Sequence, residues 1–327
     1  MPEETEFNIT VYAKTDVGLV RSGNEDSFLV LNLSTADTWT PEIIKDESPP
    51  SHLQRFTQGH YGSILAVTDG MGGALAGEVA SRLAVESVRD RSLELQCSPE
   101  YSKFSFHERL RLAIELANLY IHYQSMTNSE YTGMGATFTA VGLMGRTAYF
   151  AQIGDSRAYV IRNGSVRQIT KDQSLVSQLV AAGHITEEEA EQHTYKNVIL
   201  QALGASPYIN VAVDSMPLLD GDTLVLCSDG LSNKMKNEEI LEIVGQSSSH
   251  KDACEGLIKL ANERGGEDNI TTLLARVEYG PRPGDDNEKP TQPLDDTWGV
   301  EAIPRDPDLP YDVDIALIDD EIDTQED

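Results

Sequence analysis

The sequence predicts an α+β fold in which antiparallel strands form layers with a smaller number of amphipathic helices. Two observations favour this class. Short segments rich in β-branched and aromatic residues recur between turn residues, and helical spacing of apolar residues is confined to a few segments. With 327 residues, of which 39% are hydrophobic, the chain can bury a substantial core.

The clearest strand signal is a meander within residues 147–170. Three short strand-like segments lie there, separated by a Gly-Asp-Ser turn around Asp155 and by Asn163-Gly164. Asn-Gly between two strands is a strong short-range signal for a hairpin. We therefore expect Asp155 to be displayed by a sharp turn at the end of two strands.

The other elements are predicted from the two-residue period of strands and the 3.6-residue period of helices. Strands are expected at 10–14, 27–32, 63–68, 136–143, 147–153, 157–162, 165–170, 210–216, 223–228 and 270–278. Helices are expected at 74–88, 107–125, 174–182, 237–244 and 252–263. In the second of these helices one face carries Leu110, Ala113, Ile114, Ala117 and Ile121, the spacing of a core-facing helix.

Two segments fit neither period. Residues 32–62 carry three prolines and scattered charge, so we expect a long surface connection, which is uncommon unless it is functional or mobile. Residues 280–327 hold half of the 14 prolines and several acidic pairs, so we expect a disordered acidic tail after a catalytic domain spanning 1–279. Residues 313–322 interleave aliphatic residues with aspartates, and this part of the tail either docks on a partner or only solubilises the chain.

The charge balance excludes several classes of function. Lys and Arg number 25 against 54 Asp and Glu, which gives a formal net charge of −29. Such a chain repels nucleic-acid phosphates and anionic lipid. No stretch approaches the roughly 18 consecutive apolar residues that a membrane span needs, and residues 1–10 are polar and acidic rather than signal-like. We expect a cytoplasmic protein that binds neither nucleic acid nor membrane.

Cysteine and histidine usage argues against a zinc site or a disulfide framework. Cys97, Cys227 and Cys254 lie far apart without paired spacing, and the 7 histidines show no HExxH-type spacing. We interpret the cysteines as reduced, buried thiols. Any metal bound by this chain must therefore be held by oxygen atoms.

Three predicted strands end in an aspartate beside glycine or serine. Asp69 and Asp229 are each followed by glycine, and Asp155 lies between Gly154 and Ser156. Glycine lets the backbone turn sharply and approach a ligand closely. One Asp-Gly pair is only a turn signal, but three such aspartates at the ends of apolar strands indicate a shared site.

Two further acidic pairs precede predicted strands. They are Glu25-Asp26 and Glu267-Asp268. Converging carboxylates repel one another, and an isolated pair 4 Å apart costs about 4 kcal/mol at an effective dielectric constant of 20. Divalent cations reverse that sign, and hard oxygen ligands select Mg²⁺, Mn²⁺ or Ca²⁺ rather than zinc.

The same residue types suit phosphate chemistry. Two such ions roughly 3.5–4 Å apart can share a carboxylate, lower the pKa of a bridging water and clamp a phosphate for in-line attack. Arg21, five residues before Asp26, carries the forked donor that binds phosphate oxygens. The constellation fits hydrolysis of a phosphate ester.

Six short motifs occur in a fixed order along the chain. They are TDVGLVRSGNED at 15–26, DGMGG at 69–73, GMGAT at 133–137, GDSR at 154–157, SDG at 228–230 and DN at 268–269. Together they resemble the bacterial type of the protein phosphatase 2C family over about residues 8–278. The resemblance implies a four-layer α-β-β-α sandwich with two mainly antiparallel sheets packed face to face and helices outside.

The resemblance also implies the binuclear site. Asp69 would be the catalytic carboxylate that bridges two Mn²⁺ or Mg²⁺ ions, with the Gly70 carbonyl as a further ligand. Asp26, Asp229 and Asp268 would complete this site. Glu25 would assist Asp26, directly or through water.

Further roles come from the same resemblance. Asp155, together with Asp229, resembles the ligand pair for a third metal ion. Arg21 resembles the catalytic arginine that binds the substrate phosphate. Residues 170–186, which include Ser174, resemble the flap beside the active site, whose mobility would govern substrate access; an ordinary helix and loop is the alternative.

One position departs from the eukaryotic type of the family. There a histidine directly follows the Asp-Gly pair and is a candidate general acid, whereas this chain has Met71. Methionine cannot transfer a proton, so the proton must come from a metal-bound water or another group. Bacterial-type members carry methionine at this position too, so the departure marks the subclass rather than the activity.

The expected activity is hydrolysis of phosphoserine and phosphothreonine in proteins phosphorylated by serine/threonine kinases, and we expect a monomer. The first alternative is a catalytically weak pseudophosphatase that binds phosphoproteins in signalling, although none of the metal aspartates is missing. A nuclease would need a basic surface, which the net charge argues against. A structural calcium site would not explain Arg21 or the absence of EF-hand spacing.

Overall fold

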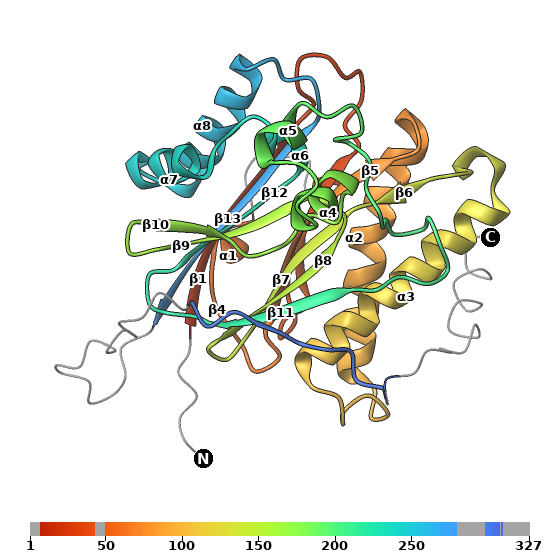
Figure 1. Ribbon diagram of the computed structural model, residues 1–327. Coiled ribbons are helices and arrows are strands. Elements are labelled where there is room, and N and C mark those ends of the chain that lie inside the picture. The colour runs from red at the N-terminus through yellow and green to blue at the C-terminus, as the bar shows by residue number, and fades with distance from the viewer. Residues whose placement is uncertain (1–6, 43–49, 280–297, 308, 310–327) are drawn as a thin grey trace.

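The computed structural model describes residues 7–42, 50–279, 298–307 and 309. Two antiparallel sheets pack face to face, and helices cover the outer face of each sheet (Figure 1). This arrangement confirms the expected α+β sandwich. No helix in the described part of the chain is both long and apolar enough to cross a membrane.

The first sheet has the strand order β10-β9-β12-β13-β1-β4. Its strands are β1 (Phe7–Asp16), β4 (Arg55–Thr57), β9 (Arg157–Arg162), β10 (Ser165–Gln168), β12 (Thr223–Cys227) and β13 (Ile270–Tyr279). The longest pairing joins the two ends of the domain, with Phe7 opposite Tyr279 and Asp16 opposite Ile270.

The second sheet has the order β14-β11-β8-β7-β5-β2-β3, and β6 pairs with β5 beside it. Its strands are β2 (Asp26–Asn32), β3 (Asp37–Trp39), β5 (Ser63–Met71), β6 (Gly135–Ala136), β7 (Phe138–Met144), β8 (Thr147–Ile153), β11 (Ala212–Pro217) and β14 (Glu301–Ala302). The turn from β8 to β9 carries the chain from this sheet to the first one, and Asp155 lies in that turn.

Long helices cover both sheets. Over the second sheet lie α2 (Ala74–Cys97) and α3 (Phe106–Thr127), and over the first lie α7 (Asn237–Gln246) and α8 (His250–Glu263) (Figure 1). The shorter helices are α1 (Ser51–Gln54), the 3₁₀ turn Ser129–Tyr131, α4 (Leu175–Ala181), α5 (Glu187–Glu191) and α6 (Asp229–Ser232).

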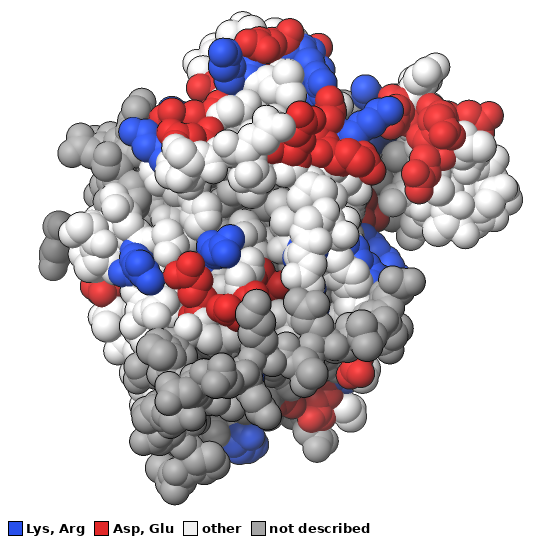
Figure 2. Space-filling view, turned by 90° about the vertical axis from the view of Figure 1, so that its left-hand side faces the viewer, with Lys and Arg blue, Asp and Glu red and all other residues white. Residues whose placement is uncertain are grey.

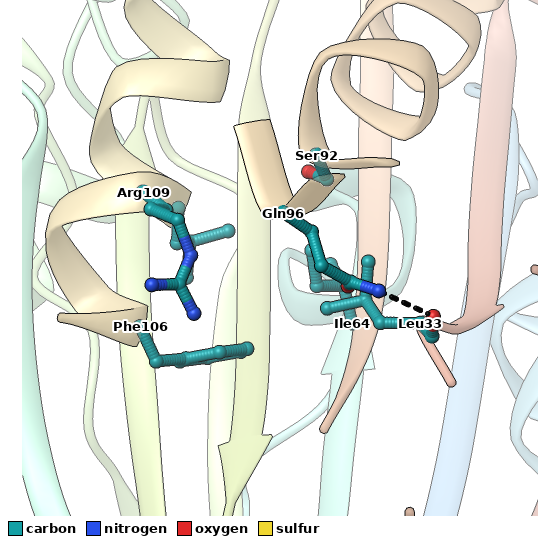
Figure 3. Close-up of a pocket in the computed structure, with 7 residues that line it drawn as sticks. Leu33, Ile64, Ser92, Gln96, Phe106 and Arg109 are labelled. Atoms are coloured by element: carbon teal, nitrogen blue, oxygen red, sulfur yellow. Dashed lines mark hydrogen bonds between the residues drawn. The ribbon is translucent and has the colours of Figure 1, made fainter. Parts of the chain in front are cut away.

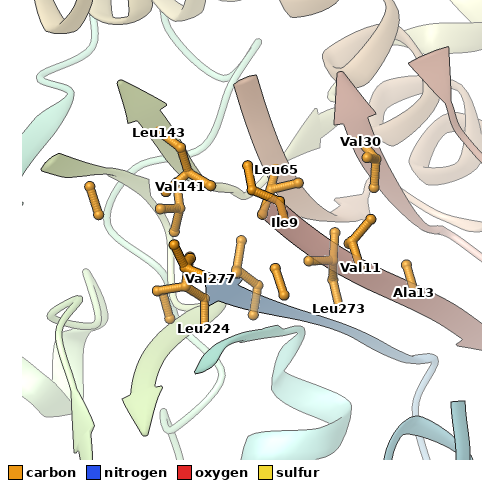
Figure 4. Packing of buried hydrophobic residues seen from close by; sticks show 14 of the residues in the cluster. Ile9, Val11, Ala13, Val30, Leu65, Val141, Leu143, Leu224, Leu273 and Val277 are labelled. Carbon is orange, nitrogen blue, oxygen red and sulfur yellow. The ribbon is translucent and has the colours of Figure 1, made fainter. Parts of the chain in front are cut away.

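The largest core cluster lies between the two sheets. Ile9, Val11 and Ala13 of β1 meet Val30 and Leu65 of the opposite sheet (Figure 4). Successive side chains of a strand point to opposite faces, so the alternate residue Tyr12 packs instead beneath α8. Both faces of this central strand are therefore buried.

Most predicted elements are confirmed. The five apolar residues predicted to face the core from the helix 107–125 are all buried in α3. The expected hairpin turn has Asn163 at φ 52° and Gly164 at φ 73°, the left-handed backbone that favours Asn-Gly. The helix expected at 74–88 is too short, because α2 continues to Cys97 through a charged stretch that obscures the apolar period.

The prediction of one long surface connection over residues 32–62 is wrong. The described part of this segment forms β3, α1 and β4, and it buries Trp39 and Leu53. Each element is only three or four residues long, too short for a period to register in the sequence.

The prediction of a disordered tail over 280–327 does not hold for residues 298–307 and 309. These residues include β14, which pairs with β11 and extends the second sheet. Trp298 and Val300 pack against the cluster between the sheets, and Leu309 is 1% exposed. Because these apolar residues are few and widely spaced, the overall composition of the segment stays polar and acidic, and the sequence therefore predicted disorder. The segment 313–322 lies outside the described residues, and the division of the chain at residue 279 stays a prediction.

Candidate active site

The centre of the candidate site is set by the register of two neighbouring strands. In the β2–β5 pair Asp26 lies directly opposite Asp69. Residues that face each other across an antiparallel pair project on the same side of the sheet, about 4.5–5.5 Å apart at Cβ. The sheet therefore brings two carboxyl groups together at the ends of apolar strands.

The first sheet contributes carboxylates to the same edge. Asp229 begins α6 directly after β12, and Asp268 lies just before β13. Ser228 joins the two sheets here, because its hydroxyl donates to the Asp26 carboxylate over 2.7 Å. With Asp155 from the β8–β9 turn, these residues form what we call the aspartate cluster: Asp26, Asp69, Asp155, Asp229 and Asp268.

The pKa values of the cluster record its crowding. Burial raises the pKa of Asp69 well above its usual range, and the charges of the four other cluster members raise it further. Burial also raises the pKa of Asp26 to about 7, against an opposing hydrogen bond from Ser228. The pKa of Asp155 rises to about 7, first through burial and then through Asp229 and Asp172. The cluster gathers carboxylates without enough positive charge to neutralise them.

The donor atoms of the cluster fit a divalent cation. Oδ1 of Asp26 and Oδ1 of Asp229 are buried and have no hydrogen-bond partner among the described residues. Buried polar atoms are normally satisfied, so two orphaned carboxylate oxygens in one cluster indicate a missing positive partner. All the donors are hard oxygens, which matches Mn²⁺ or Mg²⁺.

The carboxyl groups of the cluster must close in further to hold an ion. Within the described ranges, no group of three His, Cys, Asp or Glu side chains stands ready to bind a metal. A hydrogen bond between Asp229 and Asp69 opposes the rise of the Asp229 pKa that burial causes. The pKa of Asp229 is thus set by burial and by its neighbours Asp268 and Asp69 in the cluster.

Two glycines that pack together make room beside the cluster. A Cβ on Gly70 would lie 2.0 Å from the Gly77 carbonyl oxygen, and a Cβ on Gly77 would lie 1.9 Å from Oε2 of Glu25 and 3.0 Å from the Gly70 carbonyl oxygen. The first turn of α2 therefore leaves space in which Glu25 and the Gly70 carbonyl approach each other. Sequence reasoning missed Gly77, whose only signal is a glycine in the first turn of a helix.

Asn269 fixes the loop that carries Arg21 and Glu25. Its amide nitrogen donates to the carbonyl oxygens of Val17 and Gly23 over 2.9 and 3.0 Å, and its Oδ1 accepts from the Glu25 backbone over 2.8 Å. The sequence marks Asn269 only as part of a motif, and it did not predict this positioning role. A second missed residue is Thr137, whose hydroxyl accepts from the Asp69 backbone N–H over 2.9 Å.

Arg21 lies at the rim of the site. Its guanidinium donates to Asp268 over 2.9 Å, and its side chain is 47% exposed. An ion pair this exposed contributes little to stability, commonly less than about 1 kcal/mol. The guanidinium can therefore turn to an incoming phosphate at small cost.

The segment predicted as a flap, residues 170–186, belongs to a longer loop whose two ends are hydrogen-bonded to each other. Its base is pinned by the backbone bonds from Leu175 to Val198 and from Leu200 to Gln173, 2.8 and 2.7 Å long. Ser174 is buried at this base, where its hydroxyl caps α4. Gln173 also bonds with Gly154, so this loop starts beside the turn that carries Asp155.

Met71 ends β5 at the edge of the site and is 41% exposed. The structure thus places the residue that follows Asp69-Gly70 where a substrate can reach it. Its thioether offers no exchangeable proton.

A small cavity lies at the opposite end of the same strands. It has a volume of about 10 Å³ and lies between α2, α3 and the sheet (Figure 3). Oγ of Ser92 and Oε1 of Gln96 have no partner among the described residues, and the Gln96 amide donates to the Leu33 carbonyl over 3.0 Å. The space suits one buried water and not a substrate. It is lined by Leu33, Ile64, Ser92, Gln96, Phe106, Arg109 and Leu110.

The surface over α7 and α8 carries mixed charges. Figure 2 shows acidic and basic side chains interspersed on this face rather than one basic patch. Several of them are paired, such as Arg264 with Glu239 and Lys259 with Glu263. This face does not offer the continuous basic surface that a nucleic-acid backbone requires.

Comparison of the sequence with known families identifies a family. Residues 52–275 match the family described as Protein phosphatase 2C. A serine/threonine phosphatase stp of Listeria welshimeri is 35% identical over 264 residues, covering 80% of this chain and 93% of that protein. The protein phosphatase PhpP of Streptococcus pneumoniae is 37% identical over 217 residues, and the match covers 66% of this chain and 86% of PhpP.

Solved structures give the same likeness. The serine/threonine phosphatase PstP/Ppp of Mycobacterium tuberculosis aligns with a TM-score of 0.66 at 33% identity, covering 83% of this chain and 99% of that one. The catalytic domain of PstP in complex with two manganese ions aligns with a TM-score of 0.65 at 32% identity, with the same coverage.

Proposed function

Because this chain belongs to the bacterial protein phosphatase 2C family and is a metal-dependent serine/threonine protein phosphatase, we propose that the aspartate cluster is its catalytic metal site. The observation that carries this proposal is the pair of orphaned oxygens, Oδ1 of Asp26 and Oδ1 of Asp229, beside the crowded carboxyl group of Asp69. The substrates are phosphoproteins.

Each cluster residue has a place in the proposed site. Asp69 lies opposite Asp26, and the charges of all four other members raise its pKa, so it is the residue suited to bridge two ions. Asp26, Asp229 and Asp268 supply the remaining carboxylates. Two ions, when bound, would supply a water of lowered pKa and neutralise phosphate charge.

Neighbouring groups complete the proposed ligand set. Oε2 of Glu25 and the carbonyl oxygen of Gly70 meet beside Gly77, so they suit a ligand pair at one side of the cluster. Mn²⁺ and Mg²⁺ are both suited to these oxygens, and a relative's structure holds two manganese ions.

A third ion is proposed at Asp155. Burial and the charge of Asp229 raise the pKa of this carboxyl group, and its turn is bonded to Gln173 at the base of the flap. Ser174, next in the chain, is buried, so the flap would move about this base rather than at this residue. We propose that opening of the flap and occupancy by the third ion are linked through these contacts.

Arg21 is proposed to bind the substrate phosphate. Its exposed guanidinium lies at the rim, bonded to Asp268 of the cluster. A planar fork of donors suits two phosphate oxygens at once and orients the phosphorus for in-line attack. Since Met71 cannot donate a proton, the leaving serine or threonine oxygen must take its proton from another group.

The pseudophosphatase alternative has little support. Every carboxylate expected at the metal site is present, and burial together with neighbouring carboxylates raises the pKa values of Asp69 and Asp26. A protein that only binds phosphoproteins would have no need for such a group of repelling carboxylates. The monomeric state and the cytoplasmic location remain proposals from the sequence.

The test is hydrolysis of a phosphothreonine peptide with Mn²⁺, with EDTA, and by Asp69→Asn. EDTA and the substitution should each lower the rate at least about 10²–10³-fold, because the charge stabilisation of the transition state is lost. Asp214→Asn is the matched control, since burial also raises the pKa of Asp214 but it lies in β11 outside the cluster. Equal rates under all conditions would contradict the metal mechanism, and phosphopeptide binding without turnover would favour the pseudophosphatase.

A further inference from the structure

In the segment after the predicted domain boundary, the described residues 298–307 and 309 are bonded to the fold at several points. We call residues 298–307 and 309 the strap, drawn in dark blue from β11 to α3 in Figure 1. In the β14–β11 pair Ala302 lies opposite Asp214 and Glu301 opposite Ser215, and the Ile303 N–H donates to the Val213 carbonyl over 2.7 Å. The strap thus covers the edge of β11.

One face of α3 holds the strap. Arg111, which is 2% exposed, donates to the carbonyl oxygens of Ile303 and Pro304 over 2.6 and 3.0 Å. One turn later, Glu115 accepts both ends of the Arg305 guanidinium over 3.0 and 3.1 Å. Charged groups this buried are costly unless paired, so these contacts specify the position of the strap.

The next two turns of the same face hold a different segment. Asn118 is fully buried, and its amide donates to the carbonyl oxygens of Ser206 and Pro207 over 3.0 and 3.1 Å. Its Oδ1 accepts from the Gly204 N–H over 2.8 Å, and His122 bonds with the Gly204 carbonyl over 2.9 Å. These contacts hold Gly204, Ser206 and Pro207, which lie in the middle of residues 199–211, the return leg that leads from the flap into β11.

The four side chains share one stripe of the helix. Residues at 111, 115, 118 and 122 follow the i, i+4, i+7, i+11 spacing of one helix face. The stripe holds the strap at one end and the return leg at the other, and β11 joins them, because the return leg continues into β11 and the strap pairs with its edge. The strap, β11 and the return leg are therefore each linked to the other two, either directly or through α3.

The residues that flank the segment 280–297, Tyr279 and Trp298, both lie beside the loop that precedes β12. Tyr279 donates from its backbone to Asp220 over 2.9 Å, while Trp298 packs under the Arg162 guanidinium, which bonds with Asp222. A segment tethered this closely docks on its own chain at an effective concentration of about millimolar.

We propose that the strap is an intramolecular docking peptide that braces the return leg of the flap through β11 and α3. Its role goes beyond the proposed metal chemistry, and it does not depend on it. Release of the strap would leave the edge of β11 open and remove the contacts of Arg111 and Glu115 with the strap. The flap would then move about a looser return leg.

The test is hydrogen exchange in the full-length chain. The double variant Arg305→Gln with Leu309→Asp should release the strap, and amide exchange in residues 199–211 should rise about tenfold while β5 and β13 stay protected. Glu301→Gln is the matched control, since its side chain is exposed on the same segment. A rise confined to 212–217 and 298–309 would overturn the brace, because residues 199–211 are bonded to α3 and report loosening that is transmitted from the strap.

A second experiment does not depend on a folded substitution. A protease sequence placed within 280–297 allows the chain to be cut after folding. The cut fragment that carries the strap should still elute with the rest of the chain at the mass of one copy, and the double variant should lose it. Separate elution of the unsubstituted fragment, or elution at twice the mass, would overturn docking on the same chain.

Discussion

Two groups of buried carboxylates in this molecule differ in one respect, the presence of a cation. Asp222 is 1% exposed and binds the Arg162 guanidinium through two bonds of 2.6 and 2.8 Å. Asp26 is 5% exposed, yet one of its oxygens has no partner among the described residues. Burial is similar, so burial alone does not mark a functional residue.

The difference separates structure from chemistry. A buried carboxylate that meets a guanidinium is neutralised within the chain, and it fixes the loop that precedes β12. In the aspartate cluster Arg21 pairs with Asp268, but Oδ1 of Asp26 and Oδ1 of Asp229 have no partner among the described residues, and the carboxylates repel one another until a cation neutralises them. The aspartate cluster thus costs stability in the absence of a cation, as the proposed metal site requires, whereas the Arg162–Asp222 pair does not.

The largest expected contrast comes from removing the paired carboxylate. Asp222→Asn should lower the free energy of unfolding by about 3–5 kcal/mol, because it leaves the Arg162 charge buried without a partner. Chemical denaturation of the metal-free protein measures this. Asp37→Asn, at a side chain that is 40% exposed, is the control and should change it by less than about 0.5 kcal/mol. A loss no larger than the control's would show that Asp222 is not a structural partner.

The aspartate cluster should make the stability of the metal-free protein depend on pH. Because the folded-state pKa values of Asp26 and Asp155 are raised to about 7, the folded protein binds protons more tightly than the unfolded chain, whose aspartates titrate near 4. Stability of the EDTA-treated protein should therefore fall as pH rises from about 4 to 7, by on the order of a few kcal/mol.

Saturating Mn²⁺ should flatten that pH profile, because the cation takes the place of the protons. Thermal unfolding over the same pH range, with and without Mn²⁺, makes the comparison. A metal-free protein whose stability rises steadily from pH 4 to 7 would contradict the raised pKa values.

The smallest expected effect tests the space beside the cluster. Gly77→Ala adds a methyl group 1.9 Å from Oε2 of Glu25, so the carboxylate must move away from the Gly70 carbonyl. Alanine favours a helix over glycine, so the fold should persist while Mn²⁺ affinity falls about tenfold. Gly245→Ala, in open space on α7, is the matched control. Unchanged affinity in Gly77→Ala would exclude Glu25 from the site.

The sequence predicts the cluster well because its signals are local. Asp69, Asp155 and Asp229 each stand beside a glycine or serine near the end of a strand, Asp26 begins β2, and Asp268 lies two residues before β13. Such turns can be recognised within five residues. The core face of α3 was predictable for the same reason, since helical spacing depends only on neighbours.

What the sequence did not predict depends on contacts between distant residues. Asn269 holds Gly23 and Val17 across more than 240 positions, and Arg111 binds Pro304 across 193. Gly77 matters only because Glu25 occupies the space above it. The strap was not predicted because its few apolar anchors lie among acidic residues and prolines, a composition typical of disorder.

The most direct test is the number of Mn²⁺ ions bound per chain, measured by equilibrium dialysis of the wild type, Asp69→Asn and Asp222→Asn. The aspartate cluster should bind at least two ions in the wild type and in folded Asp222→Asn, and fewer ions than the wild type in Asp69→Asn. If Asp69→Asn binds as many ions as the wild type with the same affinity, the assignment of the aspartate cluster as the metal site is contradicted.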